Sequence, residues 1–200
     1  SQQCRAGLTG GNARKGWNDT STLTDMTTLG IFGTSGFARE VADIGEALGH
    51  RVVFIARDAT ERDAWCLPGE VMLESEVDPQ SGWVFAIGIG ENAVREKVAR
   101  RHGERLNFAN LLHPTASFGR GQRAQIEGRS GVIVCAGVRM TNNIEVGDHC
   151  IFNLNVTVGH DVIVEDFVNV SPGANISGNV HLGARCWVGT GSAINQGTTQ

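Results

Sequence analysis

A histidine and an aspartate lie next to each other in the C-terminal half of the chain, in the segment Val158-Gly159-His160-Asp161-Val162. An imidazole takes up a proton near neutral pH, and a neighbouring carboxylate can orient the ring or raise its basicity. These residue types therefore suit the removal of a proton from a hydroxyl or an amine. A turn histidine is also an ordinary solvated residue, so position alone does not distinguish His160 from His149 or His181.

A second group of candidates lies in the N-terminal half. Gly33-Thr34-Ser35-Gly36 joins an apolar run to an amphipathic one, which is where an α/β sheet binds phosphate through backbone N–H groups. The third glycine of the dinucleotide fingerprint is missing, so the pattern also fits a tight turn without a ligand. Asp58 is placed either to accept hydrogen bonds from a ribose or base or to lie in a solvated loop. Asn92 and Arg95 suit either a pyrophosphate pocket or a capped, solvated helix start.

Alternating strands and helices are expected to position this second group. Strands are predicted over residues 29–32, 50–56 and 83–87, and helices over residues 38–48 and 91–101. Such alternation predicts a parallel α/β sheet. We assign residues 26–112 to this domain.

A period of six dominates the chain from residue 132 to residue 194, in two rows that are two residues apart. The first row is apolar or small, and the second is apolar throughout: Val134, Met140, Val146, Phe152, Val158, Val164, Val170, Ile176, Leu182, Val188 and Ile194. Residues i and i+2 of a strand face the same side, so each hexad is a short strand and a corner. Three hexads close one triangular coil, and stacked coils share an aliphatic core. The pattern predicts a parallel β-helix over residues 113–200, with an insertion or irregular coil at residues 119–131.

Composition limits the function classes. The 200 residues carry a net charge of −4 without a basic run, which argues against a nucleic-acid partner, and no apolar stretch is long enough to span a membrane. The five cysteines form no CxxC pattern, and with no signal peptide visible they fit a reducing, cytoplasmic compartment. Residues 1–25 are expected to be a disordered leader. Because the repeat continues to the last residues, we expect the natural protein to extend past Gln200.

Three stretches together resemble a known family. They are residues 29–44, the junction His113-Pro114-Thr115-Ala116, and residues 158–161 followed by Ser171-Pro172-Gly173-Ala174. The chain from Met26 to Gln200 resembles the sialic acid O-acetyltransferase and UDP-amino-sugar N-acetyltransferase family of hexapeptide-repeat acyltransferases. The resemblance implies a Rossmann-like sugar-nucleotide-binding domain before a left-handed β-helix. It also implies acetyl-CoA as co-substrate and a homotrimer with active sites between neighbouring β-helices.

The resemblance also implies roles for individual residues. His160 matches the family's general base, and Asp161 matches the carboxylate that modulates it. Gly178 and Thr190 match positions that contact acetyl-CoA. Asn169 stands where some members carry a second histidine that contacts the acetyl thioester. The positions that match the sugar-nucleotide site are Gly33, Ser35, Gly36 and Asp58.

The expected reaction is direct acetyl transfer to a sugar amine or hydroxyl, because no cysteine or serine has the sequence context of a nucleophile. Two other classes stay open. One is a trimeric scaffold that binds a nucleotide without catalysis. The other is a metalloenzyme of the γ-carbonic anhydrase type, which needs three histidines on neighbouring coils. His149, His160 and His181 are 11 and 21 residues apart, whereas one coil is about 18 residues, so their spacing argues against a metal.

Overall fold

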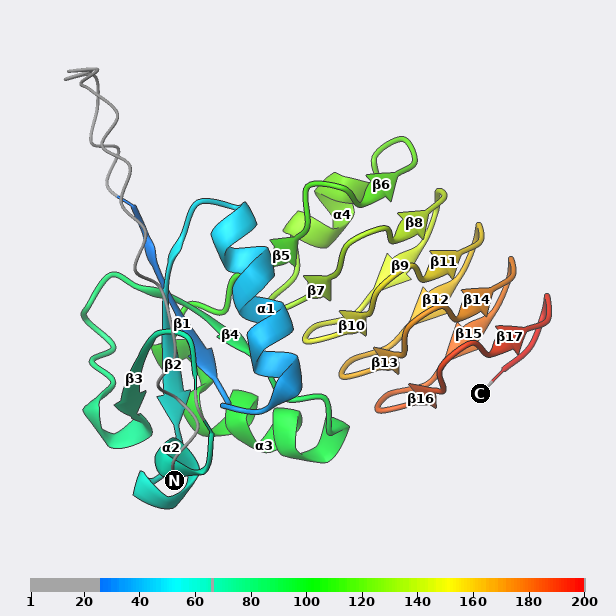
Figure 1. The fold of residues 1–200 in the computed structure, drawn as a ribbon. Coiled ribbons are helices and arrows are strands. Elements are labelled where there is room, and N and C mark those ends of the chain that lie inside the picture. Colours follow the sequence, from blue (N-terminus) through cyan, green and yellow to red (C-terminus); the bar gives the residue numbers. More distant parts are fainter. Residues whose placement is uncertain (1–25, 66, 200) are drawn as a thin grey trace, which may run out of the picture.

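The N-terminal domain is built on a parallel sheet of four strands in the order β3-β2-β1-β4 (Figure 1). A computed structural model describes residues 26–65 and 67–199, so the leader expected at residues 1–25 lies outside the described residues. The strands are β1 (Thr28–Phe32), β2 (Arg51–Ala56), β3 (Glu70–Leu73) and β4 (Val84–Ile87).

Helices cover both faces of this sheet. α1 (Gly36–Ala47) and α3 (Asn92–His102) follow β1 and β4, and α2 (Ala59–Ala64) follows β2. Short 3-10 turns occupy Glu74–Glu76 and Gly103–Arg105. Leu29 and Ile31 pack in the same cluster as Val41 of α1, whereas Phe32 packs with Val98 of α3. The predicted α/β sheet is confirmed, but the edge strand β3, none of whose residues is fully buried, was missed.

The C-terminal half is a three-sided coil of strands that are each two residues long (Figure 1). The first face holds β5 (Leu111–Leu112), β7 (Ile133–Val134), β10 (Ile151–Phe152), β13 (Asn169–Val170) and β16 (Trp187–Val188). The second holds β6 (Ser117–Phe118), β8 (Arg139–Met140), β11 (Thr157–Val158), β14 (Asn175–Ile176) and β17 (Ala193–Ile194). The third holds β9 (Glu145–Val146), β12 (Ile163–Val164) and β15 (His181–Leu182). Parallel partners such as Ile151 and Asn169 lie one coil apart, and both apolar rows fill one core, so the predicted β-helix is confirmed.

The corners of the coil have their own period of six. The backbone is left-handed at Asn143, His149, Asn155, Asp161, Phe167, Asn179 and Arg185, and glycines take the remaining places in this series. Glycine, asparagine and aspartate adopt this conformation at least cost, which is why they recur in the corners.

The first coil contains the insertion that the sequence indicated. α4 (Gln122–Glu127) separates β6 from β7. The inserted residues increase the sequence separation between paired strands, so that Leu111 pairs with Ile133, whereas Ile151 pairs with Asn169 in a later coil. The β-helix therefore starts at Leu111, two residues before the predicted boundary, whereas Phe108 still forms a bridge with Phe85 of the N-terminal sheet.

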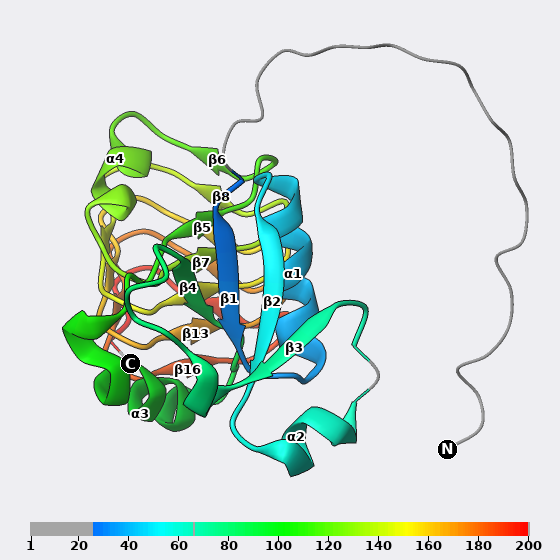
Figure 2. The same ribbon diagram turned by 90° about the vertical axis from the view of Figure 1, so that its left-hand side faces the viewer.

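The two domains share a core. Ile133, Cys135 and Ile151 point out of the first face of the β-helix and are buried in one cluster with Ala38 and Val41 of α1. α1 therefore lies between its own sheet and the β-helix, and Figure 2 shows the coils stacked behind the N-terminal sheet. Within the described residues, no helix has both the length and the apolar character needed to cross a membrane.

Candidate active site and nucleotide pocket

His160 and Asp161 form a dyad at the corner between β11 and β12. Nδ1 of His160 lies 2.6 Å from Oδ2 of Asp161, and the imidazole side chain is 54% exposed. A carboxylate only accepts hydrogen bonds, so this contact places the ring proton on Nδ1 and leaves the Nε2 lone pair free. The left-handed backbone of Asp161, with φ of 58°, belongs to the corner series and brings its carboxylate back against the ring.

Neighbouring coils support the dyad from both sides. One coil before it, the amide of Asn143 donates to Oδ1 of Asp161. The hydrogen bonds from Asn143 and His160 hold the pKa of Asp161 below its usual value, so this carboxylate is ionised at neutral pH. One coil after it, a Cβ on Gly178 would lie 2.8 Å from Cε1 and Nε2 of His160. Gly178 therefore leaves the space that the imidazole occupies.

A pocket of about 370 Å³ opens at the carboxyl ends of β1, β2 and β4, where α/β sheets bind ligands. Gly33 and Ser35 line it, as the sequence predicted. Gly33 has φ of +112°, and a Cβ there would lie 3.1 Å from the carbonyl oxygen of Gly88. The predicted phosphate turn thus forms part of a real cavity.

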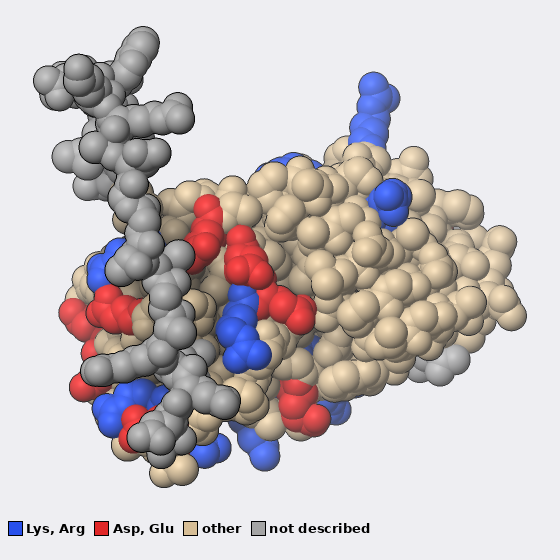
Figure 3. All heavy atoms as spheres, in the orientation of Figure 1, with Lys and Arg blue, Asp and Glu red and all other residues tan. Residues whose placement is uncertain are grey.

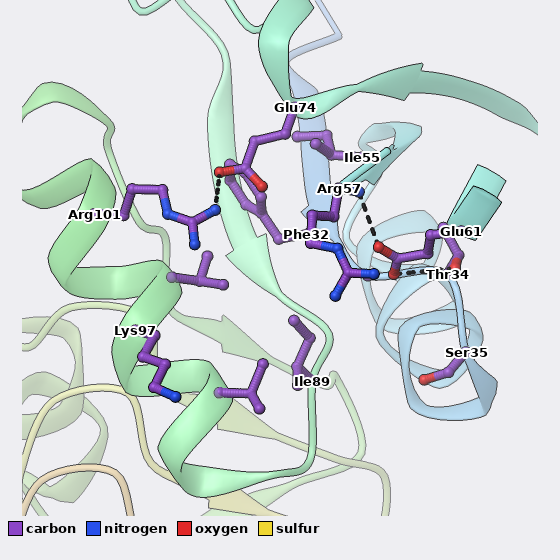
Figure 4. A pocket seen from close by; sticks show the side chains of 13 residues that line it. Phe32, Thr34, Ser35, Ile55, Arg57, Glu61, Glu74, Ile89, Lys97 and Arg101 are labelled. Carbon is purple, nitrogen blue, oxygen red and sulfur yellow. Dashed lines mark hydrogen bonds and ion pairs between the residues drawn. The ribbon is translucent and has the colours of Figure 1, made fainter. Parts of the chain in front are cut away.

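Charged side chains that the sequence analysis missed surround this pocket (Figure 4). Lys97 and Arg101 come from one face of α3, and Arg57 comes from the end of β2. Nη1 of Arg101 donates to Oε1 of Glu74 at 2.8 Å, and the backbone N–H of Arg57 donates to Oε2 of Glu61 at 2.9 Å. Three cations over a glycine turn suit a phosphate-bearing ligand.

Asp58 and Gly36 stand just outside this pocket. Oδ1 of Asp58 accepts the backbone N–H of Glu61 at 2.9 Å as the N-cap of α2, and Oδ2 accepts from Nε of Arg57 at 2.9 Å. The Glu61 N–H and then Arg57 keep the pKa of Asp58 below its usual value. Asp58 steadies Arg57, which lines the pocket, and its expected contact with a ribose or base stays a prediction. Gly36 is the first residue of α1.

Asn92 and Arg95 do not line the pocket, and their expected pyrophosphate role is wrong. Arg95 is 1% exposed and donates to backbone carbonyls on both domains, including His149 and Phe167 at β-helix corners. The Asn92 amide donates to the carbonyl of Arg185 at 2.8 Å. Both side chains join α3 to the β-helix, so no donor of Arg95 is left for a phosphate.

Comparisons with known proteins agree with both halves of this architecture. Residues 28–102 match the PglD N-terminal domain family. A stretch of 68 residues is 32% identical to GDP-perosamine N-acetyltransferase of Escherichia coli O157:H7. This match covers 34% of the chain, and it spans only 31% of the length of that curated relative.

Solved structures share the whole arrangement. A mutant of perosamine N-acetyltransferase from Caulobacter crescentus, in complex with CoA and GDP-perosamine, matches with a TM-score of 0.75 and 25% identity over 86% of this chain and 81% of that one. The acetyltransferase domain of PglB from Neisseria gonorrhoeae matches with a TM-score of 0.75 and 27% identity over 86% of this chain and 84% of that one. The chain thus shares the fold of these acetyltransferases over most of its length. Because each match covers 86% of the chain, both of its domains have counterparts in the solved structures.

The three residues expected to contact acetyl-CoA do not meet within one copy of the chain. Gly178 lies at the corner between β14 and β15 beside His160, whereas Thr190 is exposed at the corner between β16 and β17. Asn169 is 4% exposed beneath the N-terminal domain, where its amide donates to the carbonyl of Gly90 at 2.9 Å. A thioester contact by Asn169 is thus corrected to an interdomain contact. The contact between Thr190 and acetyl-CoA stays a prediction.

The other two outward histidines differ from each other. His149, expected to be solvated, is instead buried, and its ring stacks on Phe167 with centroids 5.2 Å apart. This burial lowers the pKa of His149 below its usual value. His181 stays on the surface, 2.8 Å from Glu165. In residues 26–65 and 67–199, no three histidine, cysteine, aspartate or glutamate side chains are grouped to hold a metal ion.

Proposed function

We propose that the chain transfers an acetyl group from acetyl-CoA to the amino group of a nucleotide-linked amino sugar. The observation that carries the proposal is the His160–Asp161 dyad, which leaves the Nε2 lone pair of a half-exposed imidazole free. Relatives that bind CoA and GDP-perosamine favour this substrate pair. They favour an amine acceptor over the hydroxyl of a sialic acid.

The proposed chemistry is a direct transfer. Nε2 of His160 accepts a proton from the acceptor amine as its nitrogen attacks the acetyl carbonyl carbon. The new C–N bond forms, the C–S bond breaks, and the proton passes to the leaving CoA thiolate. Asp161 stabilises the imidazolium through Nδ1. Gly178 keeps the space beside the ring clear of a side chain.

The three cysteines in the part of the chain that the structure describes fit a route without an acyl-enzyme. Burial raises the pKa of both Cys135 and Cys150 to about 12. The thiolate is the nucleophilic form of cysteine, so these two buried thiols are poor nucleophiles at neutral pH. Cys186 packs partly buried against the β-helix core, and burial raises its pKa as well.

We propose that the N-terminal pocket holds the nucleotide. Its apolar wall includes Ile55 and Ile89, which suit a base, and its turn and cations suit a diphosphate. Lys97 extends into this space from α3 (Figure 4). Its charge is placed to pair with phosphate oxygens.

We further propose a homotrimer. Leu154, Ile163 and Trp187 are exposed apolar residues of the β-helix, with Trp187 at 52% exposure. The β-helix surface in Figure 3 carries few charges, whereas the coloured side chains gather over the N-terminal domain. Such a surface suits contact with further copies. Neighbouring copies can also bring Thr190 of one chain to the His160 corner of another.

Sedimentation equilibrium is expected to give three times the chain mass of 21.3 kDa. Trp187→Glu should weaken this assembly, because it places a charge in the apolar contact. Trp65→Glu, an exposed tryptophan of the N-terminal domain, is the matched control and should leave the mass unchanged. A monodisperse single-chain mass at micromolar concentration would contradict the trimer.

The activity itself is tested by release of CoA from acetyl-CoA in the presence of GDP- and UDP-linked amino sugars, sialic acids and free amino sugars. We expect turnover with a nucleotide-linked amine and none with a sialic acid. Lys97→Ala should raise KM for the nucleotide sugar about 10-fold through loss of a charge-assisted contact, with KM for acetyl-CoA unchanged.

Arg62→Ala provides the matched control for Lys97→Ala. Arg62 is a cation of α2 that pairs with Asp63 at 2.9 Å on the surface, and it does not line the pocket. Equal effects of the two substitutions would remove the nucleotide assignment of this pocket. Binding of nucleotide and CoA without any transfer would instead indicate a scaffold.

A further inference from the structure

A second hollow lies against the His160 corner, on the β-helix. It has a volume of about 470 Å³ and forms between the inserted helix α4 and the corner at residues 142–145. Its polar walls include Arg120, Gln122, Gln125, Asn142, Asn143 and Glu145. None of these residues lines the nucleotide pocket of the N-terminal domain.

The wall between α4 and this corner is fixed by a buried amide. Gln122 is 3% exposed, and its Nε2 donates to the carbonyl of Ile144 at 2.8 Å. Its Oε1 accepts the backbone N–H of Ile144 at 2.9 Å. Two reciprocal hydrogen bonds between buried groups hold the helix at a set distance from the coil. The hollow is therefore a built feature of the first coil.

This hollow adjoins the catalytic dyad. Asn142 and His160 occupy the same corner position on successive coils, and the backbone N–H of Asp161 donates to the carbonyl of Asn142 at 3.3 Å. Asn143 lines the hollow and also donates to the Asp161 carboxylate. Neighbouring strands stack about 4.8 Å apart. The Asn142 wall of the hollow thus lies about one coil spacing from the backbone of His160.

The exposed lining groups match a hydroxylated ring that carries an amine. Asn142 supplies an amide that can donate and accept, and Gln125 supplies an amide N–H₂ donor, since its Oε1 already accepts from Nε2 of Gln122 at 3.3 Å. Glu145 accepts from hydroxyls and attracts an ammonium group, and Arg120 donates to ring and hydroxyl oxygens. An apolar acyl chain would leave these groups without partners.

We propose that the hollow between α4 and residues 142–145 is the subsite for the hexose ring of the acceptor, and that it determines which sugar is acetylated. This inference rests on the proposed acetyl transfer. The nucleotide and the hexose then occupy separate sites, because no residue lines both pockets. The insertion in the first coil, which contains α4, then has a function as one wall of this subsite.

Steady-state kinetics of two variants test the subsite. Glu145→Gln removes the carboxylate charge, and Gln125→Trp fills the hollow from the α4 side. Each should raise KM for the nucleotide-linked amino sugar about 10-fold or more, with KM for acetyl-CoA within about two-fold of wild type. Acceptors that each lack one ring hydroxyl identify the group that pairs with Glu145. For the acceptor without that hydroxyl, Glu145→Gln should raise KM less than it does for the full sugar.

Glu127→Gln and Glu127→Trp are the matched controls. Glu127 lies on the same helix, pairs with Arg123 at 2.8 Å on the surface, and does not line the hollow. If the wild type acetylates a nucleotide sugar and the Glu145 and Gln125 variants behave like these controls, the subsite is overturned and the proposed function stands. If the wild type transfers acetyl to no amino sugar, the proposed function fails first. Circular dichroism spectra like that of the wild type exclude misfolding as the cause of any loss.

Discussion

Replacing His160 by alanine should lower kcat about 10²–10⁴-fold and leave the β-helix folded. The residue is half-exposed at a corner, so its imidazole contributes little packing. Because Nδ1 contacts Asp161, the Nε2 lone pair of His160 is free to accept a proton. The measurement is CoA release under saturating acetyl-CoA and acceptor, together with the circular dichroism spectrum.

Two further variants separate a catalytic base from a structural residue. His181→Ala removes another exposed β-helix histidine with a carboxylate partner, Glu165, and should leave kcat within about two-fold. Gly178→Ala keeps the base but places a Cβ 2.8 Å from Cε1 and Nε2 of His160. This substitution should lower kcat by moving the ring. An unchanged kcat in His160→Ala would remove the base from the mechanism, whatever the other variants do.

Asp161 sets the sign of the expected pH dependence. Hydrogen bonds from Asn143 and His160 lower its pKa, so the carboxylate is ionised throughout the neutral range. The part of the activity that depends on the Asp161 carboxylate should therefore be lost only at acid pH, below the usual titration range of an aspartate. Asn143→Ala removes the first of these hydrogen bonds and should raise the pKa of Asp161.

The repeat was the most predictable part of the fold. Alternation within a strand and a fixed period between strands are local properties, so Val158 and Val164 could be placed in the core without knowledge of their neighbours. The Gly33 turn was predictable for the same reason. Lys97 carried a usable signal that was missed, because it lies near Val94 and Arg101 on one face of α3, toward the pocket.

The interdomain contacts could not be predicted in the same way. Asn169 occupies an outward position of its strand, and the period-two rule places such residues in solvent. It is buried because the N-terminal domain covers the first face of the β-helix there. His149 is outward at a corner for the same local reason, yet Phe108 and Phe167 enclose its ring. Which outward residues are covered depends on how the two domains dock, and that information is not local.

Arg95 is the strongest case of such a contact. Its guanidinium makes hydrogen bonds of 2.7–3.1 Å to acceptors on three segments of chain. The acceptors are the carbonyls of Ile89, Gly90, His149 and Phe167 and Oδ1 of Asn92. Burial lowers its pKa to about 10, so the side chain is still charged at neutral pH. Backbone carbonyls of the β-helix corners and of the β4–α3 turn solvate this charge in place of a carboxylate.

Arg95→Met should lower the free energy of unfolding by about 3 kcal/mol or more. Methionine fills a similar volume, but it leaves several buried carbonyls without a donor, each at a cost of about 1–3 kcal/mol. The variant no longer has to bury a charged guanidinium, and this gain offsets part of the cost. Arg95→Lys should be intermediate, because an ammonium group cannot reach acceptors spread around a planar fork. Urea unfolding followed by tryptophan fluorescence measures the change.

Arg100→Met is the matched control, since it removes an arginine from the same helix. Arg100 is 75% exposed and pairs with Glu96 one turn away, so its loss should change stability by about 0.5 kcal/mol or less. A large loss in both variants would indicate a general effect of helix charge. A small loss in both would mean that water replaces the guanidinium at the carbonyls, and the docking of the domains would then rest on the apolar contacts of α1. A large loss in Arg95→Met alone is the result that ties the domain interface to this one side chain.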